Sequence, residues 1–124
     1  MEKKILIVDD VEFNIEFQKE MIGSLIDNVD VDIQIDTAHT VSDALDLIAE
    51  NDKYDAMVVD MNLPDGSGVD IAKAALKKSE ETRIAALTIY PSKYENERCF
   101  FDLFLRKPIM PNDYKQNFAR LLHL

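Results

Sequence analysis

Short apolar runs alternate along the chain with segments of helical spacing, and this alternation restricts the fold more than any other feature. Four short apolar runs have the pattern of buried strands, at residues 5–8, 56–59, 84–87 and 103–105. A fifth segment, residues 31–35, alternates apolar and polar residues, as a half-exposed strand does. Segments with helical spacing or helix-start signals follow them, at 11–27, 41–48, 67–76 and 112–122, and a short helix with a weak apolar pattern is expected at 92–99. The pattern predicts a doubly wound α/β domain, a five-stranded parallel sheet with helices on both faces.

Size and charge exclude several classes of protein. A chain of 124 residues suits one domain with one core. Lys and Arg number 14 against 24 Asp and Glu, and the net charge of −10 argues against direct binding to nucleic acid or to an anionic membrane surface. The single cysteine, Cys99, cannot form an internal disulfide, and no apolar run approaches the ~20 residues of a membrane span. We therefore expect a cytoplasmic protein.

Polar side chains follow four of the predicted strands at the point where each strand ends. Asp9 and Asp10 follow the first strand, Asp60 the third, Thr88 the fourth and Lys107 the fifth. Because the carboxyl ends of parallel strands share one edge of a sheet, where ligands bind, we expect these five side chains to converge.

Converging carboxylates need a counterion. Two charges ~4 Å apart repel by about 4 kcal/mol at an effective dielectric near 20. A hard divalent cation removes this repulsion, which indicates Mg²⁺, with Mn²⁺ as the alternative. A metal beside a carboxylate and an ammonium group is also an arrangement suited to phosphoryl transfer onto the carboxylate.

Four segments at these strand ends resemble the receiver domain of two-component response regulators (CheY-like). The segments are 4–10 (KILIVDD), 59–68 (VDMNLPDGSG), 86–88 (ALT) and 104–108 (FLRKP). The resemblance covers almost the whole chain and implies a flavodoxin-like fold with strand order 2-1-3-4-5. It also implies a single receiver domain over residues 1–124, and we see no output domain. Residues 10–14 (DVEFN) are similar to receivers attached to hybrid kinases.

The resemblance also assigns the acidic residues their roles. It makes Asp60 the phosphoacceptor. Asp9 and Asp10 would hold Mg²⁺, together with Asp60 itself and the main-chain carbonyl of Asn62. Asp10 has a plainer alternative, as the N-cap of the helix that follows it.

The same resemblance implies a conformational switch that responds to phosphorylation of Asp60. Lys107 would contact the phosphoryl group, before a cis peptide bond to Pro108. Thr88 would move to hydrogen-bond the phosphoryl group, and Phe104 would turn inward behind it. The alternatives are that Thr88 only caps its strand and that Phe104 is a core residue, a role compatible with switching.

Three departures from the family pattern concern rate and output. Ile89 stands where the family has a small residue, and we expect it to narrow access to the acceptor. Tyr90 and Asn62 occupy positions that tune dephosphorylation in this family. The interval between Thr88 and Lys107 is shorter than is usual in the family, and the shortening falls in the region of the fourth helix. Five of the ten aromatic residues of the chain lie within residues 90–104. Two interpretations of this cluster stay open, a local aromatic core or a partner-binding face.

The sequence thus predicts a phosphorylation-dependent switch. A histidine kinase or histidine phosphotransfer protein would be the donor, and an unknown downstream protein or a second copy in a homodimer would receive the output. We expect no enzymatic activity beyond self-phosphorylation and autodephosphorylation. The alternative is a phosphorylation-independent pseudo-receiver that acts as a protein-interaction module. A Mg²⁺-dependent phosphatase is disfavoured, because such enzymes carry their nucleophile on the first strand.

Overall fold

The computed structural model describes residues 2–27, 30–51, 53–89 and 91–122, with the backbone alone for 91–95. The elements in chain order are β1 (Glu2–Val8), α1 (Glu12–Ile26), β2 (Asp32–Ala38), α2 (Val41–Glu50), β3 (Ala56–Asp60), α3 (Gly68–Lys78), β4 (Arg83–Thr88), the 3₁₀ helix η1 (Pro91–Phe100), β5 (Leu103–Arg106) and α4 (Pro111–Leu122). The strands form one parallel sheet in the order β2-β1-β3-β4-β5, which confirms the predicted architecture.

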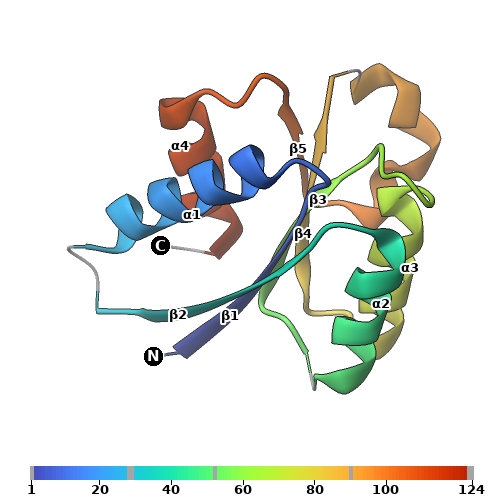
Figure 1. The fold of residues 1–124 in the computed structure, drawn as a ribbon, viewed down its shortest axis with the longest axis horizontal. Coiled ribbons are helices and arrows are strands. Elements are labelled where there is room, and N and C mark those ends of the chain that lie inside the picture. Colours follow the sequence, from blue (N-terminus) through green and yellow to red (C-terminus); the bar gives the residue numbers. More distant parts are fainter. Residues whose placement is uncertain (1, 28–29, 52, 90, 123–124) are drawn as a thin grey trace.

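Helices cover both faces of the sheet (Figure 1). On one face α1 and α4 pack side by side, and on the other α2 lies beside α3, with η1 next to α3. Each face has its own apolar cluster, one around Ile5, Ile15 and Phe118 and the other around Leu6, Val59 and Ile71. The sheet therefore separates two layers of core.

The burial of each strand follows its place in the sheet. All of β3 is buried, as its continuous apolar run predicts for a central strand. β2 lies at an edge, and its burial alternates over the first half of the strand. β1 and β2 are both longer than their apolar runs, because they pair in register from Glu2 with Asp32 to Val8 with Ala38.

Two helix starts agree with the predicted caps. Thr40 Oγ1 accepts a hydrogen bond from the N–H of Asp43, and Ser67 Oγ accepts one from Val69, both at 3.1 Å. α4 begins at Pro111, one residue before the predicted Asn112, since proline is well suited to the first helical position.

The interval between β4 and β5 contains the largest departure from regular structure. The helix predicted over 92–99 is present, but it is a 3₁₀ helix over Pro91–Phe100. Within the described ranges, no helix has both the length and the apolar character needed to cross a bilayer.

Candidate functional site

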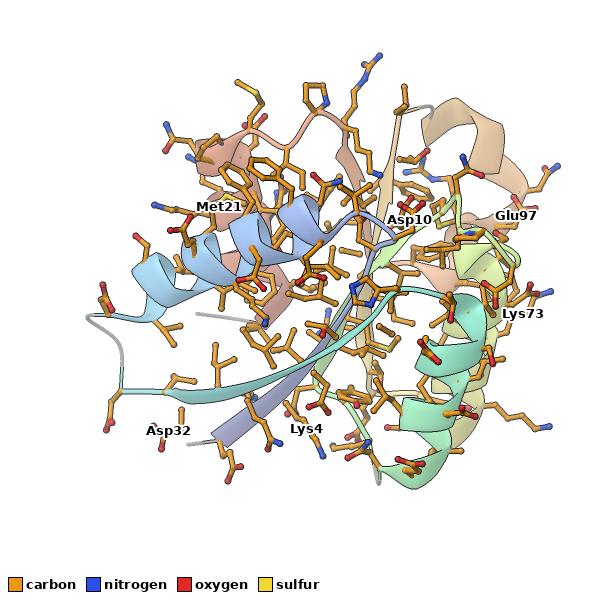
Figure 2. The ribbon with its side chains drawn as sticks, viewed as in Figure 1. Lys4, Asp10, Met21, Asp32, Lys73 and Glu97 are labelled. Atoms are coloured by element: carbon orange, nitrogen blue, oxygen red, sulfur yellow. The ribbon has the colours of Figure 1, made fainter. Side chains whose placement is uncertain are left out.

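An acidic pocket lies at the carboxyl edge of the sheet. Oxygen atoms of Asp9, Asp10 and Asp60 lie within 4.8 Å of one another. Asp9 is 0% exposed and Asp60 is 2% exposed, whereas Asp10 faces solvent. In Figure 2, Asp10 lies in the upper half of the view, whereas Lys4 near the start of β1 and Asp32 at the start of β2 lie in the lower half. The sequence prediction that these carboxylates converge is confirmed.

Main-chain groups orient the two buried carboxylates. Asp9 Oδ1 accepts a hydrogen bond from the N–H of Val11 at 2.9 Å, and Asp60 Oδ1 accepts one from the N–H of Asn62 at 3.1 Å. The N-cap of α1 is Val11, and within the described chain no side chain caps this helix, so the alternative role of Asp10 as a cap is wrong. Both orienting bonds come from the turn that follows the strand.

Lys107 brings a positive charge into the pocket. Its Nζ donates a hydrogen bond to Asp60 Oδ2 at 3.0 Å and lies 3.9 Å from Asp9 Oδ2. The N–H of Lys107 donates to the carbonyl of Thr88 at 3.0 Å, which fixes the end of β5 beside β4. The peptide bond to Pro108 is cis, as the resemblance implies.

Burial raises the pKa of the Asp9 carboxyl, and the nearby Asp60 carboxylate adds to the rise. The Val11 N–H and the Lys107 ammonium lower this pKa, but burial is the largest influence. Among the described residues, Asp9 Oδ2 has no hydrogen-bond partner. A buried oxygen without a donor, set among three carboxylates, fits a hard divalent cation such as Mg²⁺, which prefers oxygen ligands.

The remaining predicted residues lie on or directly after the strands that carry this pocket and its lysine. Thr88 ends β4 and is 7% exposed, and Ile89 follows it with 54% exposed. Phe104 is half-buried on β5 and pairs with Ala86, so it lies on the same face of the sheet as Thr88. The side chain of Asn62 is exposed.

Tyr90, the other residue predicted to tune dephosphorylation, lies outside the described residues.

The comparisons with known proteins agree with this geometry. The family model described as response regulator receiver domain matches residues 5–119. The chain belongs to this family. It is thus a response regulator receiver domain of two-component systems, with an acidic pocket formed by Asp9, Asp10 and Asp60.

Two curated relatives are much longer proteins. The receiver domain is 28% identical over 123 residues to the hybrid signal transduction histidine kinase L of Dictyostelium discoideum, covering 91% of this chain and 7% of the relative. It is 33% identical over 90 residues to the response regulator protein PilR of Pseudomonas aeruginosa, covering 73% of this chain and 19% of the relative. The chain therefore spans less than one fifth of each relative's length.

A solved structure shares the fold along nearly the whole chain. This structure is the response regulator protein TrrA of Thermotoga maritima in complex with Mg²⁺ and BeF. It is 30% identical, with a TM-score of 0.72, and the match covers 97% of this chain and 99% of the other.

Two residues of the 59–68 segment have structural roles that the sequence analysis did not predict. Asp65 accepts hydrogen bonds from the N–H groups of Val41 and Ser42 at 2.7 and 3.0 Å, and these bonds hold its pKa below the usual value. Gly68 packs so closely that a Cβ atom there would lie 2.8 Å from the carbonyl oxygen of Asp60. The sequence signal for Gly68 was its place in the 59–68 segment.

Proposed function

We propose that this receiver domain accepts a phosphoryl group on Asp60 in a Mg²⁺-dependent reaction. The observation that carries the proposal is the position of Asp60, whose carboxylate lies 3.0 Å from the Lys107 ammonium and shares a pocket with Asp9 and Asp10. A carboxylate at the end of a central strand, flanked by a cation and by further metal ligands, is arranged for nucleophilic attack on phosphorus.

The donor is a phosphohistidine on a histidine kinase or a histidine phosphotransfer protein. An oxygen of Asp60 forms the new P–O bond as the P–N bond to the donor imidazole breaks. The imidazole nitrogen leaves with the electron pair of that bond. The match to a hybrid histidine kinase supports a partner of this class.

The other side chains of the pocket complement the charge of the phosphoryl group. Asp9, Asp10 and Asp60, with the carbonyl of Asn62, would hold Mg²⁺, and Mn²⁺ is the alternative ion. The metal, when bound, neutralises charge on the phosphoryl oxygens. Lys107 binds a phosphoryl oxygen, and the Thr88 hydroxyl donates a hydrogen bond to another.

The output of this reaction is a change in partner binding. Once the Thr88 hydroxyl turns toward the phosphoryl group, Phe104 moves into the space behind it, and the surface around β5 changes. The catalytic activity of the domain is confined to its own phosphorylation and dephosphorylation.

Intact-protein mass spectrometry tests the acceptor. We expect the wild-type chain to gain one phosphoryl group from a phosphorylated phosphotransfer protein with Mg²⁺ present, and Asp60→Asn to gain none. The matched control is Asp46→Asn, which changes an exposed aspartate on α2. Absence of an adduct from every donor, despite Mg²⁺ binding, would favour a phosphorylation-independent interaction module.

A substitution of Ile89 tests whether this side chain limits the access of phosphodonors to Asp60. It is 54% exposed beside Thr88, and we propose that it limits the approach of small donors to Asp60. Ile89→Ala should therefore speed phosphorylation by acetyl phosphate while leaving the Mg²⁺ affinity unchanged. Equal rates in the two proteins would remove this role.

A further inference from the structure

The Phe104 ring is held by two side chains. The guanidinium carbon of Arg98 lies 5.3 Å from the centroid of the ring. The Phe101 ring lies 5.5 Å away at an interplanar angle of 57°. Arg98 belongs to η1 and Phe104 to β5, so the contact between cation and ring joins the 3₁₀ helix to the edge strand.

η1 is an unusually long 3₁₀ helix that carries a second cation–ring contact. It runs for 10 residues, whereas 3₁₀ helices of more than about four residues are uncommon because their hydrogen-bond geometry is poor. A second cation, Lys73 on α3, lies 5.3 Å from the centroid of the Phe100 ring. In Figure 2, Lys73 and Glu97 lie on the same side of the molecule, where η1 runs beside α3. Cation–ring contacts therefore join this end of η1 to both α3 and β5.

The Phe104 ring is also close to the acceptor site through the strands. Phe104 pairs with Ala86, two residues before Thr88, so Phe104 and Thr88 share a face of the sheet. The carbonyl of Thr88 accepts a hydrogen bond from Lys107, whose ammonium contacts Asp60. A displacement of Thr88 toward Asp60 therefore changes the space beside the ring.

We propose that Arg98 is a positioning residue that holds Phe104 in its unphosphorylated arrangement and so ties η1 to the state of Asp60. This inference rests on the proposed function, in which Thr88 and Phe104 carry the switch. In this proposal the ring leaves the guanidinium when it moves toward Thr88. The contact with Arg98 therefore favours the unphosphorylated arrangement, and its free energy opposes binding of the phosphoryl group.

Beryllofluoride, a phosphoryl mimic, tests this coupling. Its binding with saturating Mg²⁺ is measured by titration, using the ¹⁹F NMR signal of the bound anion. Arg98→Gln should bind beryllofluoride about two- to fivefold more tightly than the wild-type protein, because it lacks one exposed cation–π contact. Arg98→Lys, which keeps a cation, should lie between Arg98→Gln and wild type. The matched control is Lys73→Gln, which also removes one positive charge and one cation–ring contact at 5.3 Å. Lys73 contacts Phe100 and not Phe104, so this variant should bind beryllofluoride with the affinity of the wild-type protein.

A double-mutant cycle separates positioning from a purely structural role. In a Phe104→Leu background, Arg98→Gln should no longer change the affinity, because the ring on which the guanidinium acts is gone. An unchanged or weaker affinity in Arg98→Gln, or a gain that persists without Phe104, would overturn the inference while leaving the acceptor role of Asp60 intact. Failure of the wild-type protein to bind beryllofluoride would instead remove the proposed function, and this inference with it.

Discussion

The Lys107 ammonium lies 3.0 Å from Asp60 Oδ2, although the two residues are 47 positions apart in the chain. The same ammonium lies 3.9 Å from Asp9 Oδ2. One cation therefore serves two buried carboxylates, at the place where we propose that a divalent ion and a phosphoryl group bind together. The protein holds its acidic pocket partly neutralised before any ligand arrives.

Lys107→Gln should separate metal binding from phosphoryl transfer. Removal of a positive charge this close to the carboxylates should tighten Mg²⁺ binding on the order of tenfold. Loss of a donor to the phosphoryl oxygens should slow phosphorylation on the order of a hundredfold. Calorimetric titration of Mg²⁺ and initial rates from mass spectrometry check the two effects. Lys115→Gln, which changes a half-buried lysine on α4 bonded to Ser24 on α1, is the control and should leave both quantities unchanged.

Gly68→Ala should destabilise the fold and disturb the acceptor. A Cβ atom at this position would lie 2.7 Å from Val59 Cγ1 and 2.8 Å from the Asp60 carbonyl oxygen, so the backbone must move. We expect the free energy of unfolding to fall by about 1–3 kcal/mol, and phosphorylation of Asp60 to slow.

The control for Gly68 is Gly23→Ala. No heavy atom of the described chain beyond its own helix backbone and its neighbours lies within 4 Å of a Cβ built at Gly23, in the C-terminal part of α1. That substitution should raise the free energy of unfolding by about 0.5–1 kcal/mol. Denaturant unfolding measures both variants, and similar changes in the two would contradict the packing argument.

Asp65 should make stability depend on pH. Its pKa is held below the usual value of 3.8 by hydrogen bonds from the N–H groups of Val41 and Ser42. A carboxyl with a lower pKa in the folded chain stabilises the fold above its unfolded pKa, and this contribution is lost as the pH falls through the folded pKa. Asp65→Asn should therefore have a lower Tm than wild type at about pH 7, and the difference should shrink below the usual pKa of 3.8. Thermal unfolding across this range is the measurement, and a Tm difference independent of pH would argue against the charge as its cause.

Tyr114 and Gln18 form a buried polar pair between α4 and α1. The Tyr114 hydroxyl donates to Gln18 Oε1 at 2.8 Å, and Gln18 Nε2 has no hydrogen-bond partner among the described residues. Tyr114→Phe should cost about 1–3 kcal/mol, because it leaves the amide oxygen buried without a donor. Adding Gln18→Leu should recover most of that loss, since both polar groups are then gone. Denaturant unfolding of the single and double variants checks this, and a double variant less stable than Tyr114→Phe alone would contradict it.

The sheet and the acidic pocket could be predicted because they depend on local patterns and on a general rule of topology. Apolar runs indicate strands, and the carboxyl ends of parallel strands share one edge, so Asp9, Asp60 and Lys107 could be placed together from their positions alone. The caps at Thr40 and Ser67 are local as well, since each side chain bonds to a main-chain group two or three residues away.

What the sequence could not predict depends on contacts that no local pattern encodes. Asp65 is exposed and polar, but its partner Val41 is 24 positions away. The 3₁₀ geometry of η1 was missed because Pro91–Phe100 has a weak apolar pattern that does not distinguish one helix type from another. The packing of Arg98 on Phe104 arises where the chain turns from η1 into β5, and cations in a helix more often face solvent.

Successive residues of β5 contribute to different halves of the core. Leu103 and Leu105 pack with the cluster under α1 and α4, whereas Phe104 packs with the cluster under α2 and α3. The rearrangement of Phe104 that we propose would therefore repack the cluster under α2 and α3, while Leu103 and Leu105 stay packed in the cluster under α1 and α4. Because one strand supplies both clusters with separate residues, a substitution of Phe104 changes the packing on one face of the sheet and leaves the apolar contacts of the other face in place.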